Sequence, residues 1–369
     1  MRARILAYYL PQFHPVPEND EWWGKGFTEW TNVAKAKAMF RGHYQPRLPA
    51  ALGYYDLRVP EVREAQADMA RANGIEGFCY YHYWFGNGRQ MLERPFNEVL
   101  ASGSPDYPFC LCWANESWKG IWFGDDRTLI EQTYGGAEDT RQHFEYLLRA
   151  FRDPRYMTVD GKPIFQILTP NNLPDMLAMT DTLREMAHKH GLAGLYLVAG
   201  YRAPIGWDPR EGGFDAAVSS HFNSGLRSDN KMRLRWLVNR WLHMKRFSAS
   251  RKLQRLFKRY YRVLDYAATT RNFRVTKHYD YDYFPMAIPN WDNTPRSGTR
   301  GYVLTDSTPE EFKKHLAEAI EYVHDYEPEH RIVFIKSWNE WAEGNYLEPD
   351  ARFGLGYLKA VRDSVWADV

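Results

Sequence analysis

Eight short runs rich in β-branched and aromatic residues recur along this 369-residue chain, with amphipathic helical patterns between them. Strands that alternate with helices favour a parallel sheet. The sequence has no Gly-rich dinucleotide or phosphate-loop signature, which argues against an open doubly wound sheet. We predict an α/β fold, one (β/α)8 TIM-type barrel over residues 1–369 with a basic helical insertion at 226–265. The predicted strands are 5–10, 77–83, 109–113, 163–168, 195–199, 216–219, 286–289 and 332–337, and the helices are 59–73, 139–152, 173–190 and 309–326.

Two carboxylates, Glu340 and Glu343, follow the last predicted strand directly. If these residues form one helical turn, both side chains lie on the same side of it. Two carboxyl groups roughly 5 Å apart are what a retaining glycosidase requires. The alternative is a pair of solvated loop charges, but Trp338 and Trp341 flank the glutamates, which is unusual at an ordinary surface. The pattern predicts a sugar-active site with Glu340 and Glu343 as catalytic residues.

Aromatic residues make up 16% of the chain, including 14 Trp and 25 Tyr. Sugar sites combine aromatic platforms with polar groups that orient the ring, although many aromatics must also belong to the core. Clusters that mix both kinds of residue, at 79–85, 113–118 and 289–293, follow predicted strands, as Glu340 does. In a barrel the catalytic groups lie where strands end. We therefore expect a carbohydrate-binding site at the C-terminal mouth.

The second predicted strand offers two alternating faces. Tyr80, His82 and Trp84 share one face, and Tyr81 and Tyr83 share the other. One face lines the barrel and the other meets the helices. We expect the first face to contact substrate, because a histidine is costly against apolar helices; a hydrogen-bonded core histidine is the alternative.

Further substrate contacts are expected after other strands. Asn115 and Glu116 could hold sugar hydroxyls, although Glu116 could instead serve a turn. Trp291 and Asp292 suggest a stacking platform and a hydroxyl acceptor, or else a packed loop. The remaining expected contacts are Gln12, His14, Trp30, Trp113, Asn339 and Trp341.

The charge distribution is uneven along the chain. The net charge is only +2, so no nucleic-acid partner is expected, yet residues 227–262 contain 13 Lys and Arg against one acidic residue. Apolar residues recur there at helical spacing, which predicts an amphipathic helix or helical pair. From Arg227 to Arg262 this segment could contact an anionic membrane, a lipid-linked substrate or an acidic glycan; it could equally be a solvated face.

Other sequence features bear on the compartment. The mean hydropathy is −0.61, and no apolar run approaches the roughly 18–20 residues that span a bilayer. Residues 1–11 lack the pattern of a signal peptide and are better explained as a first strand. Cys79, Cys110 and Cys112 fall within predicted strands, as small buried hydrophobes do. We expect a reducing compartment, most simply the cytoplasm.

Several motifs resemble the WbsX-type domain, a family related to glycoside hydrolase family 99, the endo-α-mannosidases. The resemblance runs from about residue 3 to residue 360. It implies a (β/α)8 barrel and metal-independent, retaining cleavage of an α-mannoside or a similar sugar, with no cofactor. The motifs are YLPQFH at 9–14, WWGKGFTEW at 22–30, FCYYHYWF at 78–85, LCWANE at 111–116 and WNEWAEG at 338–344.

The resemblance also implies roles for the two glutamates. Glu340 would remove the proton of the sugar 2-hydroxyl, so that the 2-oxygen attacks the anomeric carbon and forms a 1,2-anhydro sugar. Glu343 would protonate the leaving oxygen and then activate water. The chain departs from the endo-mannosidases at Ala342, where they tend to have a larger polar residue, often His. The subsite contact made there is not carried over.

Two other functions remain open from the sequence. Many WbsX-type domains are associated with lipopolysaccharide or O-antigen biosynthesis as presumed glycosyltransferases, and Asp280 and Asp282 superficially match an acidic pair that binds a metal–nucleotide sugar. A turn is the commoner explanation for such a pair. The other alternative is a non-catalytic glycan-binding barrel that keeps its cleft.

Overall fold

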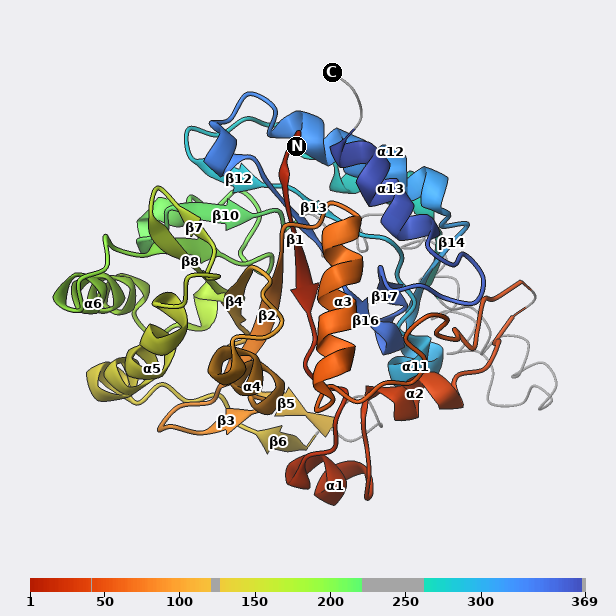
Figure 1. Cartoon of the computed structure of the whole chain (residues 1–369), viewed down its shortest axis with the longest axis horizontal. Coiled ribbons are helices and arrows are strands. Elements are labelled where there is room, and N and C mark those ends of the chain that lie inside the picture. The colour runs from red at the N-terminus through yellow and green to blue at the C-terminus, as the bar shows by residue number, and fades with distance from the viewer. Residues whose placement is uncertain (41, 121–126, 221–261, 367–369) are drawn as a thin grey trace, which may run out of the picture.

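The computed structural model describes residues 1–40, 42–120, 127–220 and 262–366, which form the predicted barrel (Figure 1). Parallel strands follow one another around the sheet in chain order, and β15 returns to pair with β1. Seven of the predicted strands are confirmed to within two residues at each end. They are β1 (Arg4–Tyr9), β2 (Gly77–Trp84), β4 (Phe109–Trp113), β8 (Lys162–Ile167), β9 (Tyr196–Ala199), β10 (Ala216–Val218) and β15 (Ile332–Ile335).

The remaining strand position is split in two. β12 (Asp282–Phe284) pairs with β10, and β13 (Met286–Ala287) pairs with β15, so together they join the two edges of the sheet. Pro285 separates them because it has no N–H to donate to a ladder. Its carbonyl still accepts a hydrogen bond from the Phe334 N–H at 3.0 Å. The predicted strand at 286–289 therefore begins earlier, at Asp282, than the sequence indicated.

Helices surround the barrel and cover the outer faces of its strands (Figure 1). The four predicted helices are confirmed as α3 (Pro60–Ala72), α5 (Gly136–Phe151), α6 (Met176–Lys189) and α12 (Pro309–Tyr322). α12 begins as its sequence indicates, with Pro309 in the first turn and the Thr308 hydroxyl accepting a hydrogen bond from the Glu311 N–H. α4 (Arg94–Ser102) and α13 (Gly356–Val365) are further helices that the sequence patterns did not reveal.

Short elements build the connections between strands and helices. The β1–α3 connection carries α1 (Pro17–Trp23) and α2 (Glu29–Lys35), and α11 (Thr294–Ser297) follows β13. The chain after β15 forms a small hairpin of β16 (Asn339–Glu340) and β17 (Asn345–Tyr346). The other short elements are β3 (Gln90–Met91), β5 (Trp118–Lys119), β6 (Thr128–Ile130), β7 (Thr158–Val159), β14 (Tyr302–Thr305) and α10 (Tyr266–Thr270).

Most of the basic insertion predicted at 226–265 lies outside the described residues, since residues 221–261 are not among them. Its last four residues form a strand, β11 (Arg262–Asp265), which pairs in parallel with β14. The prediction of helix at 262–265 is therefore wrong, because these residues find a strand partner in Tyr302–Thr305. In the described part of the chain, every helix is too short or too polar to cross a membrane.

Candidate active site

A cavity of about 520 Å³ opens where the barrel strands end. Its lining includes residues that follow β1, β4, β9, β13 and β15 in the sequence, and the connections that carry α1, α2 and α11 complete it. Among the site residues predicted from the sequence, those that line the cavity are Gln12, Glu116, Trp291, Glu340 and Glu343.

A tight turn carries the two glutamates. Glu340 ends β16, and Trp341–Glu343 form a 3₁₀ turn where the sequence predicted one helical turn. In 3₁₀ geometry the side chains at positions i and i+3 eclipse, so Glu340 and Glu343 lie on one side. The Ser337 hydroxyl accepts a hydrogen bond from the Glu340 N–H at 3.0 Å and fixes the start of the turn.

Glu340 forms a buried ion pair. Its Oε2 lies 2.7 Å from Lys336 Nζ and accepts a hydrogen bond from Asn345 Nδ2 at 3.0 Å. Lys336 also donates to the Tyr81 hydroxyl at 3.2 Å. Burial alone would lower the pKa of Lys336, but the charge of Glu340 raises it above its usual value. This lysine remains positively charged beside the Glu340 carboxylate.

Glu343 shares a guanidinium with a third acid. Arg296 Nη1 donates to Glu343 at 2.8 Å, and Arg296 Nη2 donates to Glu29. Burial raises the pKa of Glu343, and the negative charge of Glu340 raises it further, against the opposing charge of Arg296. Burial likewise raises the pKa of Glu29, and Arg296 opposes that shift. Glu343 therefore holds a proton more readily than a solvated glutamate does.

The balance of charge supports the same conclusion. Among the described residues, three buried carboxyl side chains at the cavity, on Glu29, Glu340 and Glu343, are 1%, 7% and 10% exposed. Two buried cations, Lys336 and Arg296, oppose them with side chains 4% and 11% exposed. An uncompensated buried charge is costly, so this cluster favours one protonated carboxyl.

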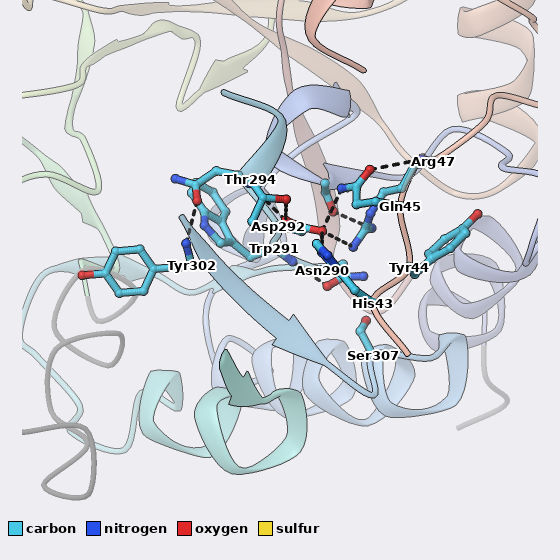
Figure 2. A network of polar contacts seen from close by, with 12 residues as sticks. His43, Tyr44, Gln45, Arg47, Asn290, Trp291, Asp292, Thr294, Tyr302 and Ser307 are labelled. Carbon is cyan, nitrogen blue, oxygen red and sulfur yellow. Dashed lines mark hydrogen bonds and ion pairs between the residues drawn. The ribbon is translucent and has the colours of Figure 1, made fainter. Parts of the chain in front are cut away.

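Asp292 is the centre of a buried network beside the cavity (Figure 2). Its Oδ2 accepts hydrogen bonds from His43 Nε2 and Gln45 Nε2, both at 2.7 Å, and its Oδ1 accepts one from the Thr294 hydroxyl at 2.6 Å. The Met39 N–H donates to His43 Nδ1, so the ring proton lies on Nε2. Burial alone would raise the pKa of Asp292, but the bond from His43 and the Arg47 charge hold it below its usual value.

This network holds the turn that carries Glu340 and Glu343. The Asp292 N–H donates to the Glu343 carbonyl at 2.6 Å, and Arg47 Nη1 donates to the Gly344 carbonyl at 3.0 Å. Gly344 has φ of 61°, and a Cβ there would lie 2.8 Å from Asp292 Cβ, so only glycine fits. The expectation that Asp292 accepts a sugar hydroxyl is wrong, because its oxygens are buried and occupied by protein donors.

The expected orientation of β2 is also wrong. Tyr81 and Tyr83 line the cavity, whereas Tyr80, His82 and Trp84 face the surrounding helices. Tyr80 packs on Phe96 of α4, and Trp84 Nε1 donates to Asp139 of α5 at 3.0 Å.

A hydrogen-bond partner explains why a histidine is tolerated on the helix side. His82 Nε2 lies 2.8 Å from His143 Nε2 of α5, so its ring is satisfied within the core. Burial lowers the pKa of His82 to about 3, which keeps the ring neutral. The alternative of a satisfied core histidine describes this residue.

Other expected contacts are buried and lie outside the cavity lining. Asn115 bonds the N–H and carbonyl of Thr169, and Asn339 bonds those of Leu10, so each amide ties two connections together. His14 is 1% exposed. The expectation that these three side chains contact substrate is wrong, because the fold encloses them.

Three of the five tryptophans expected to contact substrate are enclosed as well. Trp30 donates to the Tyr55 carbonyl at 2.8 Å, and Trp113 donates to the Trp84 carbonyl at 2.9 Å. Trp341 donates to Glu348 at 2.6 Å and stacks on Tyr346. Each indole N–H is satisfied by the protein and each ring is buried, so the expectation of sugar contact is wrong for these residues too.

The cavity contains charged residues that the sequence reasoning did not select. Glu29 lies within the motif at 22–30, and Lys336 lies within the last predicted strand, so both had a signal. Arg296 and Arg202 lie in connections without any recognisable pattern. Arg202 pairs with Glu116 at 2.7 Å nearer the solvent. In the described ranges, no group of three or more His, Cys, Asp or Glu could hold a metal ion.

Comparison with known proteins identifies the family to which this chain belongs. The family model described as glycosyltransferase WbsX matches residues 5–361. The chain belongs to the WbsX family. Two proteins named WxcX, both uncharacterized and from two strains of Xanthomonas campestris pv. campestris, are 39% identical over 366 residues. The match covers 98% of this chain and 50% of each relative, so the chain spans about half their length.

Solved structures share the fold of this WbsX-family chain. A glycoside hydrolase-like protein superposes with a TM-score of 0.60 at 15% identity, covering 98% of this chain and 93% of that protein. The GH99 endo-α-mannosidase from Bacteroides thetaiotaomicron, in complex with BIS-TRIS-propane, gives 0.56 at 14% identity, covering 98% and 96%. These likenesses show that the chain has a TIM-type barrel fold, and they carry no function by themselves.

The Asp292 network yields a test of stability. In Asp292→Asn, one carboxylate oxygen becomes an N–H₂ that faces either His43 and Gln45 or the Thr294 N–H, so a buried donor is left unsatisfied in both orientations. We expect the free energy of unfolding to fall by about 3 kcal/mol, measured by urea denaturation. Asp280→Asn is the matched control, since that side chain is 80% exposed, and should change it by less than about 0.5 kcal/mol. Equal midpoints for the two variants would contradict the role given to Asp292.

Proposed function

We propose that this protein is a retaining glycoside hydrolase that cleaves an α-mannoside-like linkage in a polysaccharide or lipid-linked oligosaccharide. The observation that carries the proposal is the pair Glu340 and Glu343, buried on one turn at the cavity. Tyr81, Tyr83 and Trp291 supply aromatic surface around the pair, as saccharide sites require.

The first step forms an anhydro sugar. The Glu340 carboxylate takes the proton of the sugar 2-hydroxyl, and the 2-oxygen attacks the anomeric carbon. The bond from that carbon to the leaving oxygen breaks while the Glu343 carboxyl gives its proton to the leaving oxygen. The products are a 1,2-anhydro sugar, a released alcohol, a protonated Glu340 and an ionised Glu343.

The second step restores the site. The Glu343 carboxylate takes a proton from water, and the water oxygen attacks the anomeric carbon. The bond from that carbon to the 2-oxygen breaks, and the 2-oxygen recovers its proton from Glu340. Two inversions at the anomeric carbon give net retention.

The environments of the glutamates support this division. The ammonium group of Lys336 lies 2.7 Å from Glu340 Oε2, so a positive charge stands directly beside the proposed base. Burial and the neighbouring Glu340 charge raise the pKa of Glu343, which suits an acid. Environments that push two carboxyl groups toward different protonation states are a common basis for acid and base roles.

Glycosyl transfer is a second candidate, favoured by the description of the matching family model. Asp280 and Asp282 do not supply it with a shared acidic site: Asp280 pairs with Arg210 at 3.0 Å, while Asp282 bonds Tyr196 and His330. Neither aspartate lines the cavity. A nucleotide sugar with Mn²⁺ that raises the melting temperature would favour transfer.

Substitution of each glutamate tests the hydrolase proposal. Glu340→Gln and Glu343→Gln should each lower hydrolysis by about 10²-fold or more, because each removes a proton transfer. Product chain lengths from a panel of bacterial surface polysaccharides provide the measurement. Glu98→Gln is the control, because Glu98 is a partly exposed ion-pair residue that does not line the cavity.

Leaving-group chemistry sharpens this experiment. An aryl glycoside with an acidic phenol needs no protonation to depart, so its first step should survive in Glu343→Gln but not in Glu340→Gln. Unchanged hydrolysis in either variant with the natural linkage would refute the assignment. Binding without turnover in the unmodified protein would favour a glycan-binding barrel.

Because Glu29 and Glu343 share the Arg296 guanidinium, replacement of Glu29 should change the pH dependence of hydrolysis. In Glu29→Gln a negative charge near Glu343 is lost, and the positive charge of Arg296 is opposed by one carboxylate fewer. Both changes lower the pKa of Glu343. Glu343 would then lose its acidic proton at lower pH, so the alkaline limb of the pH–rate profile should move to lower pH. The comparison is with Glu98→Gln, which should leave the limb in place. An unmoved limb in Glu29→Gln would contradict the charge-sharing cluster.

A further inference from the structure

Asn19 has an unusual environment within the cavity. It lies on α1, is 0% exposed and lines the cavity. Among the described residues, no hydrogen-bond partner meets either its side-chain Oδ1 or Nδ2. A buried polar group left unsatisfied costs about 1–3 kcal/mol. A ligand that enters the cavity and forms hydrogen bonds with this amide would offset the cost and explain why the amide is present.

The surroundings of Asn19 suit a saccharide. Trp23, half-buried on the same short helix, and Phe27 line the cavity beside it, with their rings 6.1 Å apart. Asn32 adds a second amide from α2. An amide can donate to one sugar hydroxyl and accept from its neighbour, while an indole covers the apolar face of the ring. A neutral sugar needs no charged side chain for binding of this kind.

This group of residues lies in the same cavity as the catalytic pair. Glu29, at the start of α2, connects the two regions because Arg296 bridges it to Glu343. The cavity volume of about 520 Å³ lies within the range of roughly 300–1,000 Å³ that accommodates drug-sized ligands, which exceed one sugar ring.

We propose that Asn19 and Trp23 form a second saccharide subsite. It binds a neutral hexopyranose unit next to the sugar unit whose glycosidic bond Glu340 and Glu343 cleave. The identity of the adjoining unit as an α-mannoside-like sugar rests on the proposed function. The presence of the subsite rests on the orphaned amide, the indole and the shared cavity.

Asn19→Leu separates a ligand-binding role from a structural one. The side chains are nearly equal in size, but leucine removes the orphaned polar atoms. The melting temperature should therefore stay equal or rise, while the affinity for a saccharide that fills the subsite should fall about tenfold. A structural asparagine would instead lower the melting temperature when replaced.

The binding measurement uses methyl α-D-mannopyranoside and α-linked mannooligosaccharides of two to four units, titrated by calorimetry against protein carrying Glu340→Gln. In that background, affinity should increase with chain length, and Asn19→Leu should abolish the increase. Asn73→Leu is the matched control, because the Asn73 amide donates to the Met69 carbonyl at 2.8 Å. It should lower the melting temperature and leave the affinities unchanged.

Two results would overturn the subsite. One is an absence of any chain-length gain in the Glu340→Gln protein, including the case in which no saccharide binds. The other is a chain-length gain that persists in Asn19→Leu, which would leave ordered water as the partner of the amide. The proposed function fails separately, if Glu340→Gln leaves hydrolysis unchanged.

Discussion

Closure of the parallel sheet is the constraint on which the rest of this structure depends. The split strand at 282–287 joins β10 to β15, and every barrel strand then runs in the same direction. Parallel strands in a ring end at one pole, so connections from distant parts of the sequence meet there. Gln12, Glu116 and Glu340 line one cavity for this reason. The break at Pro285 allows one segment to pair with β10 first and with β15 afterwards.

Burial gives the charges at this pole their chemical character. Glu29, Glu340 and Glu343 face Lys336 and Arg296 with little access to water, where unpaired charge is costly. Burial and the neighbouring Glu340 charge raise the pKa of Glu343, and a proton on this carboxyl offsets that cost. His43, Gln45 and Asp292 do not line the cavity, yet the Asp292 N–H bonds the Glu343 carbonyl and helps to hold the turn that carries both glutamates.

Periodicity and local motifs predicted the strands well because side-chain alternation and buried apolar runs are local properties. The same patterns could not choose between the two faces of β2. His82 looked polar enough for the cavity, but His143 of α5 satisfies it on the helix side. Asp292, Asn115 and Asn339 were selected for their chemistry, and each proved to bond the protein's own backbone or side chains. Arg296 was missed because nothing beside it in the sequence indicates its partner.

The sequence by itself determined the alternation of strands and helices, the family, and the spacing that brings Glu340 and Glu343 onto one turn. These features depend on residues within a few positions of one another. The tertiary structure decided which polar side chains face the cavity and which are buried as supports. It also decided that Arg296 bridges Glu29 and Glu343, residues more than 300 positions apart. Such choices depend on partners that only the closed fold brings together.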